Sequence, residues 1–375
     1  MKISIIGMGY VGCVTAAIAA KEGHDIIGVD ISQNKIDMIN SGISPIIEPG
    51  LQDLFTSAKD KNKLAATTDL NLAIKTTSLS IICVGTPSKK DGSTDLSFID
   101  KVSKDLLKEL TKSNKNHTIM VRSTIPPGTM EKLFIPRFSK LSNINVCYNP
   151  EFLREGTAVA DYYNPPYIIA AVNTDNSRIV IEDFYRNIKA EMIFTSFKTA
   201  EISKVVNNIF HALKIVFANE IKRFSEAFDL DDKEIMDIVK KDKKLNLSPV
   251  YLNPGFSYGG SCLPKEIEGF LALSSKENLN LPVISGISIS NDIHFETRLT
   301  QILQLKKEKI AILGLSFKND TDDLRNSPYL KLAKRLVKAG CHIKIFDKTL
   351  NTSKLLGSNR KYIEEKLSNI DDFLI

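Results

Sequence analysis

A glycine-rich turn near the N-terminus constrains the fold of this chain more than any other feature. The β-rich run Lys2–Ile6 leads into Gly7–Gly12, which has the spacing G-x-G-x-x-G, and an alanine-rich helical segment follows. The first glycine permits a tight turn, the second lets the backbone approach a pyrophosphate, and the third lets helix pack on strand. The N-terminus of that helix then faces the anion. The pattern predicts the beginning of a dinucleotide-binding domain.

An acidic residue at the end of the next expected strand supports this interpretation. Asp30 lies 23 residues after Gly7 and ends the apolar run Asp25–Asp30. A carboxylate there can bind the ribose hydroxyls, and it would repel a 2′-phosphate, so NAD is favoured over NADP. Lys35 complicates the argument, because a nearby cation could serve NADP.

The same N-terminal stretch also resembles a secretory signal peptide. Met1 and Lys2 precede an uncharged run to Ala20 that ends in Ala-Ile-Ala. The glycines and the second apolar strand favour the nucleotide domain instead, and we expect a cytoplasmic protein. No other segment is long and apolar enough to span a membrane.

Polar residues follow several further apolar runs. Leu79–Val84, Thr118–Val121 and Ile144–Tyr148 predict strands of the same sheet. In open α/β sheets ligands bind at the carboxyl ends of the strands. The residues expected at this edge are Thr86, Thr124, Glu151 and Glu155.

Length and charge limit the class of protein. A chain of 375 residues is too long for one small core, so we expect two or three domains. Fifty basic and 44 acidic residues give a net charge of +6. This excess of positive charge is too small for a nucleic-acid-binding surface, but it suits an anionic small ligand. The five cysteines form no C-x-x-C pair, which argues against a disulfide framework or a zinc cluster and for a reducing compartment.

A long helix is expected between about Thr199 and Phe228, where proline and glycine are absent. Lys204, Asn208 and His211 stand at i, i+4 and i+7 and so project from one face; Ile215 and Asn219 continue the stripe. Such residues are costly to bury unless they meet a ligand or one another. The alternative is an ordinary solvated polar face.

The segment 253–266 is a glycine-rich loop with one cysteine, Cys262, and a cation at Lys265. Of the five thiols, only Cys262 is expected outside a strand or helix core. Free N–H groups and Lys265 would favour a thiolate nucleophile. Taken alone, a loop cysteine is more often inert than catalytic.

The last part begins a new α/β unit. A strand over Ile310–Leu315, a helix of about a dozen residues and a strand over Ile343–Phe346 are expected. Without a second glycine motif, this unit would hold phosphate through side chains such as Lys318 and Arg325. The predicted fold is α/β throughout, with an N-terminal doubly wound Rossmann domain (1–198), a central helical domain with the cysteine loop (199–304) and a partial Rossmann-like domain (305–375).

Together these features resemble the UDP-glucose/GDP-mannose dehydrogenase family over nearly the whole chain. Finer features resemble the GDP-mannose 6-dehydrogenase branch of alginate producers. The motifs that match are Gly7–Gly12, Val84–Pro87, Asn149–Glu155, Lys204 with Asn208, Gly259–Pro264 and Ser316–Pro328; the finer features are Gly85–Lys90 and Lys244–Ser248.

The resemblance implies a four-electron oxidation of a primary alcohol to a carboxylate with two NAD consumed. Cys262 would trap the intermediate aldehyde, Lys204 and Asn208 would stabilise oxyanions, Glu151 is a candidate general base, and Thr124 and Glu266 would position water. NAD would contact Gly7, Gly9, Tyr10, Val11, Gly12, Asp30, Lys35, Thr86, Thr124, Lys265 and Arg325. The sugar nucleotide, GDP-mannose or UDP-glucose, would contact Glu155, Lys204, Asn208, His211, Asn219, Tyr251, Phe256 and Lys318. The family also implies a homodimer.

The chain departs from the family pattern in four places. Glu266 stands where the family has Asp, and Val250 and Asn253 stand where GDP-mannose enzymes have Tyr and Arg. Family chains also continue several dozen residues further. Two alternatives therefore stay open beside an active 6-dehydrogenase: a two-electron hydroxyacid-type dehydrogenase, and a remnant that binds NAD with little activity.

Overall fold

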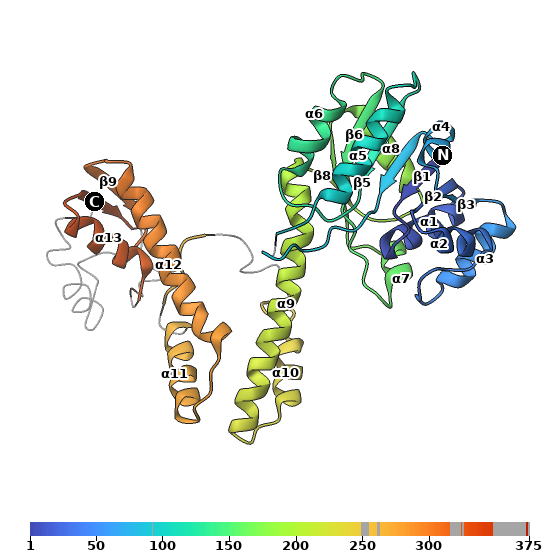
Figure 1. Cartoon of the computed structure of the whole chain (residues 1–375). Helices are drawn as coiled ribbons and strands as arrows, with labels where there is room; N and C mark the ends of the chain where they lie inside the picture. The colour runs from blue at the N-terminus through green and yellow to red at the C-terminus, as the bar shows by residue number, and fades with distance from the viewer. Residues whose placement is uncertain are drawn as a thin grey trace. The chain divides into compact units, whose positions relative to one another are not determined.

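The computed structural model describes residues 1–91, 93–248, 255–260, 263–315, 324, 326–347 and 373, apart from the side chains of 266, 269 and 273. The chain divides into two compact units, Met1–Phe210 and His211–Ile375, and each is described by itself (Figure 1). The boundary falls inside one long helix, α9 (Phe197–Ala227).

Within its described residues, the first unit is built on one eight-stranded sheet in the order β3-β2-β1-β4-β5-β6-β7-β8. Neighbouring strands are parallel except β6 and β7, which are antiparallel. The strands are β1 (Lys2–Ile6), β2 (Asp25–Val29), β3 (Leu64–Thr67), β4 (Leu79–Ile82), β5 (His117–Val121), β6 (Ile144–Tyr148), β7 (Ile168–Val172) and β8 (Met192–Phe194).

Helices cover both faces of this sheet, as Figure 1 shows. Side chains from α1, α2, α3, α7 and α8 form one hydrophobic core, and those from α4, α5, η1, α6 and the first turn of α9 form the other. Strand residues alternate between the two: Ile3 and Ile5 of β1 join the first core, and Ile6 joins the second. The helices are α1 (Tyr10–Lys21), α2 (Gln33–Asn40), α3 (Leu51–Asp60), α4 (Leu70–Thr76), α5 (Ser97–Leu110), the π-helix η1 (Met130–Phe134), α6 (Ile135–Phe138), α7 (Ala158–Tyr163) and α8 (Asp175–Phe184).

A buried polar chain crosses three strands of the sheet. The Ser4 and Ser80 hydroxyls are 2.7 Å apart, Ser80 Oγ lies 2.8 Å from His117 Nε2, and Thr77 donates to Ser4 at 3.2 Å. Burial lowers the pKa of His117 to about 4. The imidazole is therefore neutral in the folded protein at neutral pH.

The second unit combines helices with a small parallel sheet. In its described part β9 pairs with β10, and α13 packs on them with Phe295 and Leu299 of α12. Its elements after α9 are α10 (Asp232–Lys241), α11 (Leu263–Lys276), α12 (Pro282–Gln304), β9 (Lys309–Leu313), α13 (Pro328–Lys338) and β10 (His342–Phe346).

These elements confirm the predicted fold class. The strand–turn–helix interpretation of the N-terminus is correct, since β1 and α1 flank the glycine turn. Two details differ. Cys83 lies one residue beyond the end of β4, and Cys341 lies in the turn before β10 and is partly exposed, so two thiols expected in strand or helix cores lie outside the strands and helices.

None of the helices in the described ranges has both the length and the apolarity needed to cross a bilayer.

The pKa of His117 predicts an acid-sensitive stability. As pH falls from about 6.5 to about 4, the unfolded chain takes up a proton that the folded protein does not, so the free energy of unfolding should fall by about 3 kcal/mol from this group. The variant H117Q should lack this contribution, whereas H342Q, at an exposed position, should behave as wild type. Urea unfolding followed by circular dichroism between pH 7 and pH 4 measures it. Parallel pH curves for wild type and H117Q would contradict the assignment.

Candidate functional site

The glycine turn lies at the carboxyl end of β1, where the strand order reverses. β1 is flanked by β2 on one side and β4 on the other, which is the place where open α/β sheets bind ligands. Gly7 has φ +94°, and an added Cβ would lie 2.8 Å from the Val84 nitrogen. A Cβ on Gly12 would lie 2.0 Å from Gly7 O, whereas one on Gly9 would meet nothing within 4 Å. The turn therefore packs tightly against β4 and α1 and leaves Gly9 open to a ligand.

Asp30 is held in place beside this turn. Its carboxylate accepts hydrogen bonds from the Met8 amide (2.8 Å) and the Ser32 amide (3.0 Å). Lys35 Nζ lies 3.4 Å from the same carboxylate. The turn and an oriented carboxylate together fit the pyrophosphate and the ribose hydroxyls of NAD. Lys35, the cation that could have favoured NADP, is therefore paired with Asp30.

The ends of β4 and β5 are joined through their polar residues. The Thr86 hydroxyl donates to the Thr124 carbonyl at 2.8 Å, and the Ser123 hydroxyl donates to the Val84 carbonyl at 2.6 Å. Both threonines are half-buried. The structure therefore brings Thr86 and Thr124 together at the predicted edge of the sheet.

Glu151 and Lys204 form a buried ion pair at the end of β6. Lys204 Nζ contacts one carboxylate oxygen of Glu151 and donates to its backbone carbonyl at 2.8 Å. The other carboxylate oxygen accepts from the Leu153 amide at 2.6 Å. The two side chains are 8% and 11% exposed, respectively. Such an arrangement can hold or move a proton beside a bound alcohol.

The other residues of the predicted stripe on α9 differ from Lys204. Asn208, His211 and Asn219 are exposed, and His211 begins the second unit. Asn207, which the sequence did not single out, donates to Tyr167 Oη at 2.5 Å. Within the first unit, the helix therefore contributes mainly Lys204 to the site.

Two further buried carboxylates shape this edge, and the sequence did not reveal them. Glu48 accepts from Tyr10 Oη and from the amides of Gly156 and Ala158, both at 2.8 Å. Burial opposes its ionisation, but these three hydrogen bonds lower its pKa overall. The only local feature that marks Glu48 in the sequence is its place between two isoleucines and a Pro-Gly pair.

The second of these carboxylates, Glu201, lies one turn before Lys204 on α9. It accepts from the Met130 amide at 2.7 Å and from the Gly128 amide. Burial raises its pKa despite these bonds. Glu201 therefore joins α9 to the loop that follows Thr124.

A buried cation lies behind the ends of β5 and β6. Arg122 Nη1 donates to Asn149 Oδ1 and to Tyr185 Oη, both at 2.6 Å, and the guanidinium lies 5.9 Å from the Tyr162 ring. The sequence singled out Asn149 only as the first residue of a longer motif.

Three buried thiols are unsuited to nucleophilic chemistry. Burial raises the pKa of Cys13 and Cys83 to about 12 and that of Cys147 further. These groups are protonated at neutral pH, and only the thiolate is strongly nucleophilic.

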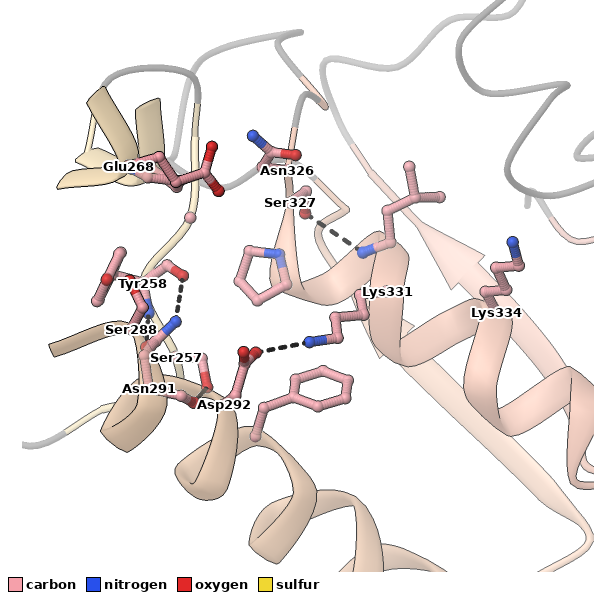
Figure 2. A pocket seen from close by; sticks show the side chains of 15 residues that line it. Ser257, Tyr258, Glu268, Ser288, Asn291, Asp292, Asn326, Ser327, Lys331 and Lys334 are labelled. Atoms are coloured by element: carbon pink, nitrogen blue, oxygen red, sulfur yellow. Dashed lines mark hydrogen bonds and ion pairs between the residues drawn. The ribbon is translucent and has the colours of Figure 1, made fainter. Parts of the chain in front are cut away.

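In the second unit, the loop that precedes Cys262 borders a pocket of about 470 Å³. Gly260 N donates to Asn326 O at 3.4 Å, and a Cβ on Gly259 would lie 2.2 Å from that oxygen. Figure 2 shows Tyr258 hydrogen-bonded to Asn291 and Lys331 paired with Asp292. Lys331 Nζ lies 2.9 Å from the Asp292 carboxylate. Two predicted motifs, Gly259–Pro264 and Ser316–Pro328, therefore meet at this pocket through their described residues.

Of the site residues predicted in the last part of the chain, the structure describes some and leaves others out. Phe256 is half-buried between Phe295 and Tyr329, with ring centroids 5.8 and 5.3 Å away, and Lys265 is exposed. Cys262, Tyr251, Lys318 and Arg325 lie outside the described residues, as do Val250, Asn253 and the side chain of Glu266.

Family models cover most of the chain. Residues 1–189 match the NAD binding domain of the UDP-glucose/GDP-mannose dehydrogenase family, 198–293 its central domain and 311–375 its UDP binding domain. The cofactor is therefore NAD. The division into domains ending at residues 198 and 304 stays a prediction.

Individual relatives agree with these matches. GDP-mannose 6-dehydrogenase of Pseudomonas syringae pv. tomato is 41% identical over 380 residues, covering 100% of this chain and 87% of the relative. UDP-glucose 6-dehydrogenase of Rickettsia bellii is 34% identical, covering 92% and 81%. A crystal structure of a ternary complex of GDP-mannose dehydrogenase from Pseudomonas aeruginosa matches with a TM-score of 0.96 at 39% identity, covering 100% and 87%.

The buried ion pair predicts a non-additive effect on stability. K204M leaves the Glu151 carboxylate buried without its cation and should lower the free energy of unfolding by about 3–5 kcal/mol. In the double variant K204M/E151Q no charge is left, so the loss should be smaller than the sum of the single losses by about 1–3 kcal/mol. Urea unfolding of the wild type, K204M, E151Q and K204M/E151Q measures this coupling. Strictly additive losses would show that the pair contributes no specific interaction.

Proposed function

The chain belongs to the UDP-glucose/GDP-mannose dehydrogenase family, and from this premise we propose that it is an NAD-dependent nucleotide-sugar 6-dehydrogenase. The proposed reaction oxidises GDP-mannose to GDP-mannuronate. One primary alcohol, two NAD⁺ and one water give one carboxylate, two NADH and three protons. UDP-glucose is the alternative substrate.

The observation that carries this proposal is the Glu151–Lys204 pair after β6, at the same edge of the sheet as the dinucleotide turn after β1. Oxidation of an alcohol requires a group that accepts the hydroxyl proton and a donor that stabilises the developing oxyanion. Glu151 has the first role in the proposal, and Lys204, with Asn208, has the second. In a nearly dry site the attraction between the Lys204 ammonium and a developing oxyanion is stronger than it would be in water.

The first unit holds the cofactor. Bound NAD supplies the hydride acceptor, twice for each sugar. The backbone of Gly7–Gly12 would take the pyrophosphate and Asp30 the ribose hydroxyls, while Thr86 and Thr124 would line the neighbouring strand ends. Tyr10, Val11, Lys35, Lys265 and Arg325 complete the proposed contacts.

In the proposed mechanism Cys262 makes the second oxidation possible. Its thiolate adds to the aldehyde carbon, forming a C–S bond, and the oxyanion takes a proton to give a thiohemiacetal. Loss of a hydride and a proton converts this to a thioester, and attack of water then breaks the C–S bond to release carboxylate and thiol. Thr124 and Glu266 would position that water.

The choice of GDP-mannose rests on the relatives. Those named GDP-mannose 6-dehydrogenase are 39–41% identical over the whole chain, whereas the UDP-glucose relatives are 34% identical over 92% of it. The proposed sugar-nucleotide contacts are Glu155, Lys204, Asn208, His211, Asn219, Tyr251, Phe256 and Lys318. A homodimer in the cytoplasm belongs to the same proposal.

NADH yield tests the reaction. With limiting GDP-mannose and excess NAD, the wild-type enzyme should form two NADH per sugar, measured by absorbance against carboxylate product. C262S should lower the rate of NADH formation from GDP-mannose by at least about two orders of magnitude, because a serine hydroxyl is a much weaker nucleophile than a thiolate. C341S, at the partly exposed second-unit cysteine, is the matched control and should keep the wild-type yield.

Other yields identify the alternatives. One NADH per sugar would support a two-electron dehydrogenase. NAD binding without turnover of GDP-mannose or UDP-glucose would support the remnant. A C262S enzyme that still yields two NADH at the wild-type rate would exclude the thioester route.

A further inference from the structure

Glu48 joins two parts of the first unit that lie far apart in the sequence. The residue is 7% exposed and precedes α3 in the segment after α2. One carboxylate oxygen accepts from Tyr10 Oη and the Gly156 amide, and the other accepts from the Ala158 amide. All three donors are therefore held by one buried side chain.

Tyr10 is the donor on the cofactor side. It is the first residue of α1 and lies between Gly9 and Gly12 in the dinucleotide turn. Its backbone follows the position of the turn, while its hydroxyl reaches Glu48 and lies 3.5 Å from the Arg154 carbonyl. If the turn moves when a pyrophosphate binds, the Tyr10 side chain therefore transmits that movement to Glu48.

The donors on the other side belong to the segment 151–158, which is held at both ends. At its start Glu151 is fixed by Lys204 and the Leu153 amide, and at its end the amides of Gly156 and Ala158 are fixed by Glu48. Between these anchors lies the exposed Glu155. Arg154 is also bonded to Asp161 of α7 through its amide and its guanidinium. Loss of the second anchor would therefore release the amides of Gly156 and Ala158, while the ion pair and the Arg154–Asp161 contact stay in place.

We propose that Glu48 is a positioning residue that couples the dinucleotide turn to the segment 151–158, so that NAD binding orders the segment that receives the sugar nucleotide. The sugar-nucleotide half of this statement rests on the proposed function. The coupling itself requires only NAD binding.

The electrostatics agree with this role. The hydrogen bonds to Glu48 lower its pKa, so at neutral pH the acceptor is a carboxylate and its bonds are charge-assisted. Burial and the hydrogen bond to Glu48 raise the pKa of Tyr10, so the phenol keeps its proton as a donor. A glutamine at position 48 would offer one acceptor and one donor group to three donors.

Hydrogen exchange measured by mass spectrometry tests the coupling directly. In the wild-type protein, saturating NAD should slow amide exchange in peptides covering 154–161 by about fivefold or more, within the usual range of coupling between sites. E48Q and Y10F, each measured at an NAD concentration that calorimetry shows to be saturating for that variant, should lose this slowing. Y10F removes a single hydroxyl and so keeps the test valid where E48Q folds poorly.

The chain offers a matched control at the other end of α1. Tyr163 Oη donates to Glu22 at 3.0 Å, and Asn187 donates to the same carboxylate at 2.8 Å. E22Q therefore removes a comparable Tyr–Glu contact between α1 and α7 that lies away from the turn. It should retain the NAD-dependent slowing in full.

Two results would overturn the inference. One is an unchanged exchange rate in the wild-type segment when NAD binds, and the other is wild-type slowing in both E48Q and Y10F. Turnover gives a second readout: E48Q should raise the KM for GDP-mannose about tenfold with kcat within about threefold. A wild-type enzyme inactive on nucleotide sugars would refute the proposed function, while the exchange result would still decide the coupling.

Discussion

The first unit depends on one buried interaction, the ion pair between Lys204 and Glu151. Each side chain is expensive to remove from water alone, and each is tolerated because the other lies against it. The carbonyl of Glu151 and the amide of Leu153 supply the remaining hydrogen bonds. The pair thereby fixes the first helical turns of α9 against the end of β6, and it places two ionisable groups at the edge where open α/β sheets bind ligands.

Buried carboxylates build the rest of this edge in the same way. Glu201 accepts amides from the loop after β5, and Glu48 accepts amides from the loop after β6. Loops that leave parallel strands have unpaired N–H groups, and a buried carboxylate satisfies two of them at once. The result is a set of strand-end loops held by buried carboxylates, beside a glycine turn that has no room for a side chain at Gly7 or Gly12.

The sequence predicted the features that depend on short-range patterns. The turn at Gly7–Gly12 and the position of Asp30 follow from spacing alone, and the buried strands follow from apolar runs. Lys204 and Glu151 were both expected at the site, but their contact joins residues 53 apart and needed the fold.

Other features could not be predicted for related reasons. Glu48 reaches amides more than a hundred residues away, and no local pattern marks which backbone groups a carboxylate will meet. Helical periodicity predicts that the residues of the stripe from Lys204 to Asn219 lie on one face of α9. It cannot predict which of these residues are buried. The antiparallel β7 likewise depends on how the chain returns to the sheet.

Turnover by the uncharged variant K204M/E151Q tests the central claim most directly. This protein keeps the packing of the ion pair without its charges, so it should fold and bind NAD as the wild type does. If the pair performs the chemistry, NADH formation from GDP-mannose should fall by at least about a hundredfold. A folded, NAD-binding double variant that oxidises GDP-mannose within a few fold of the wild-type rate would contradict the account.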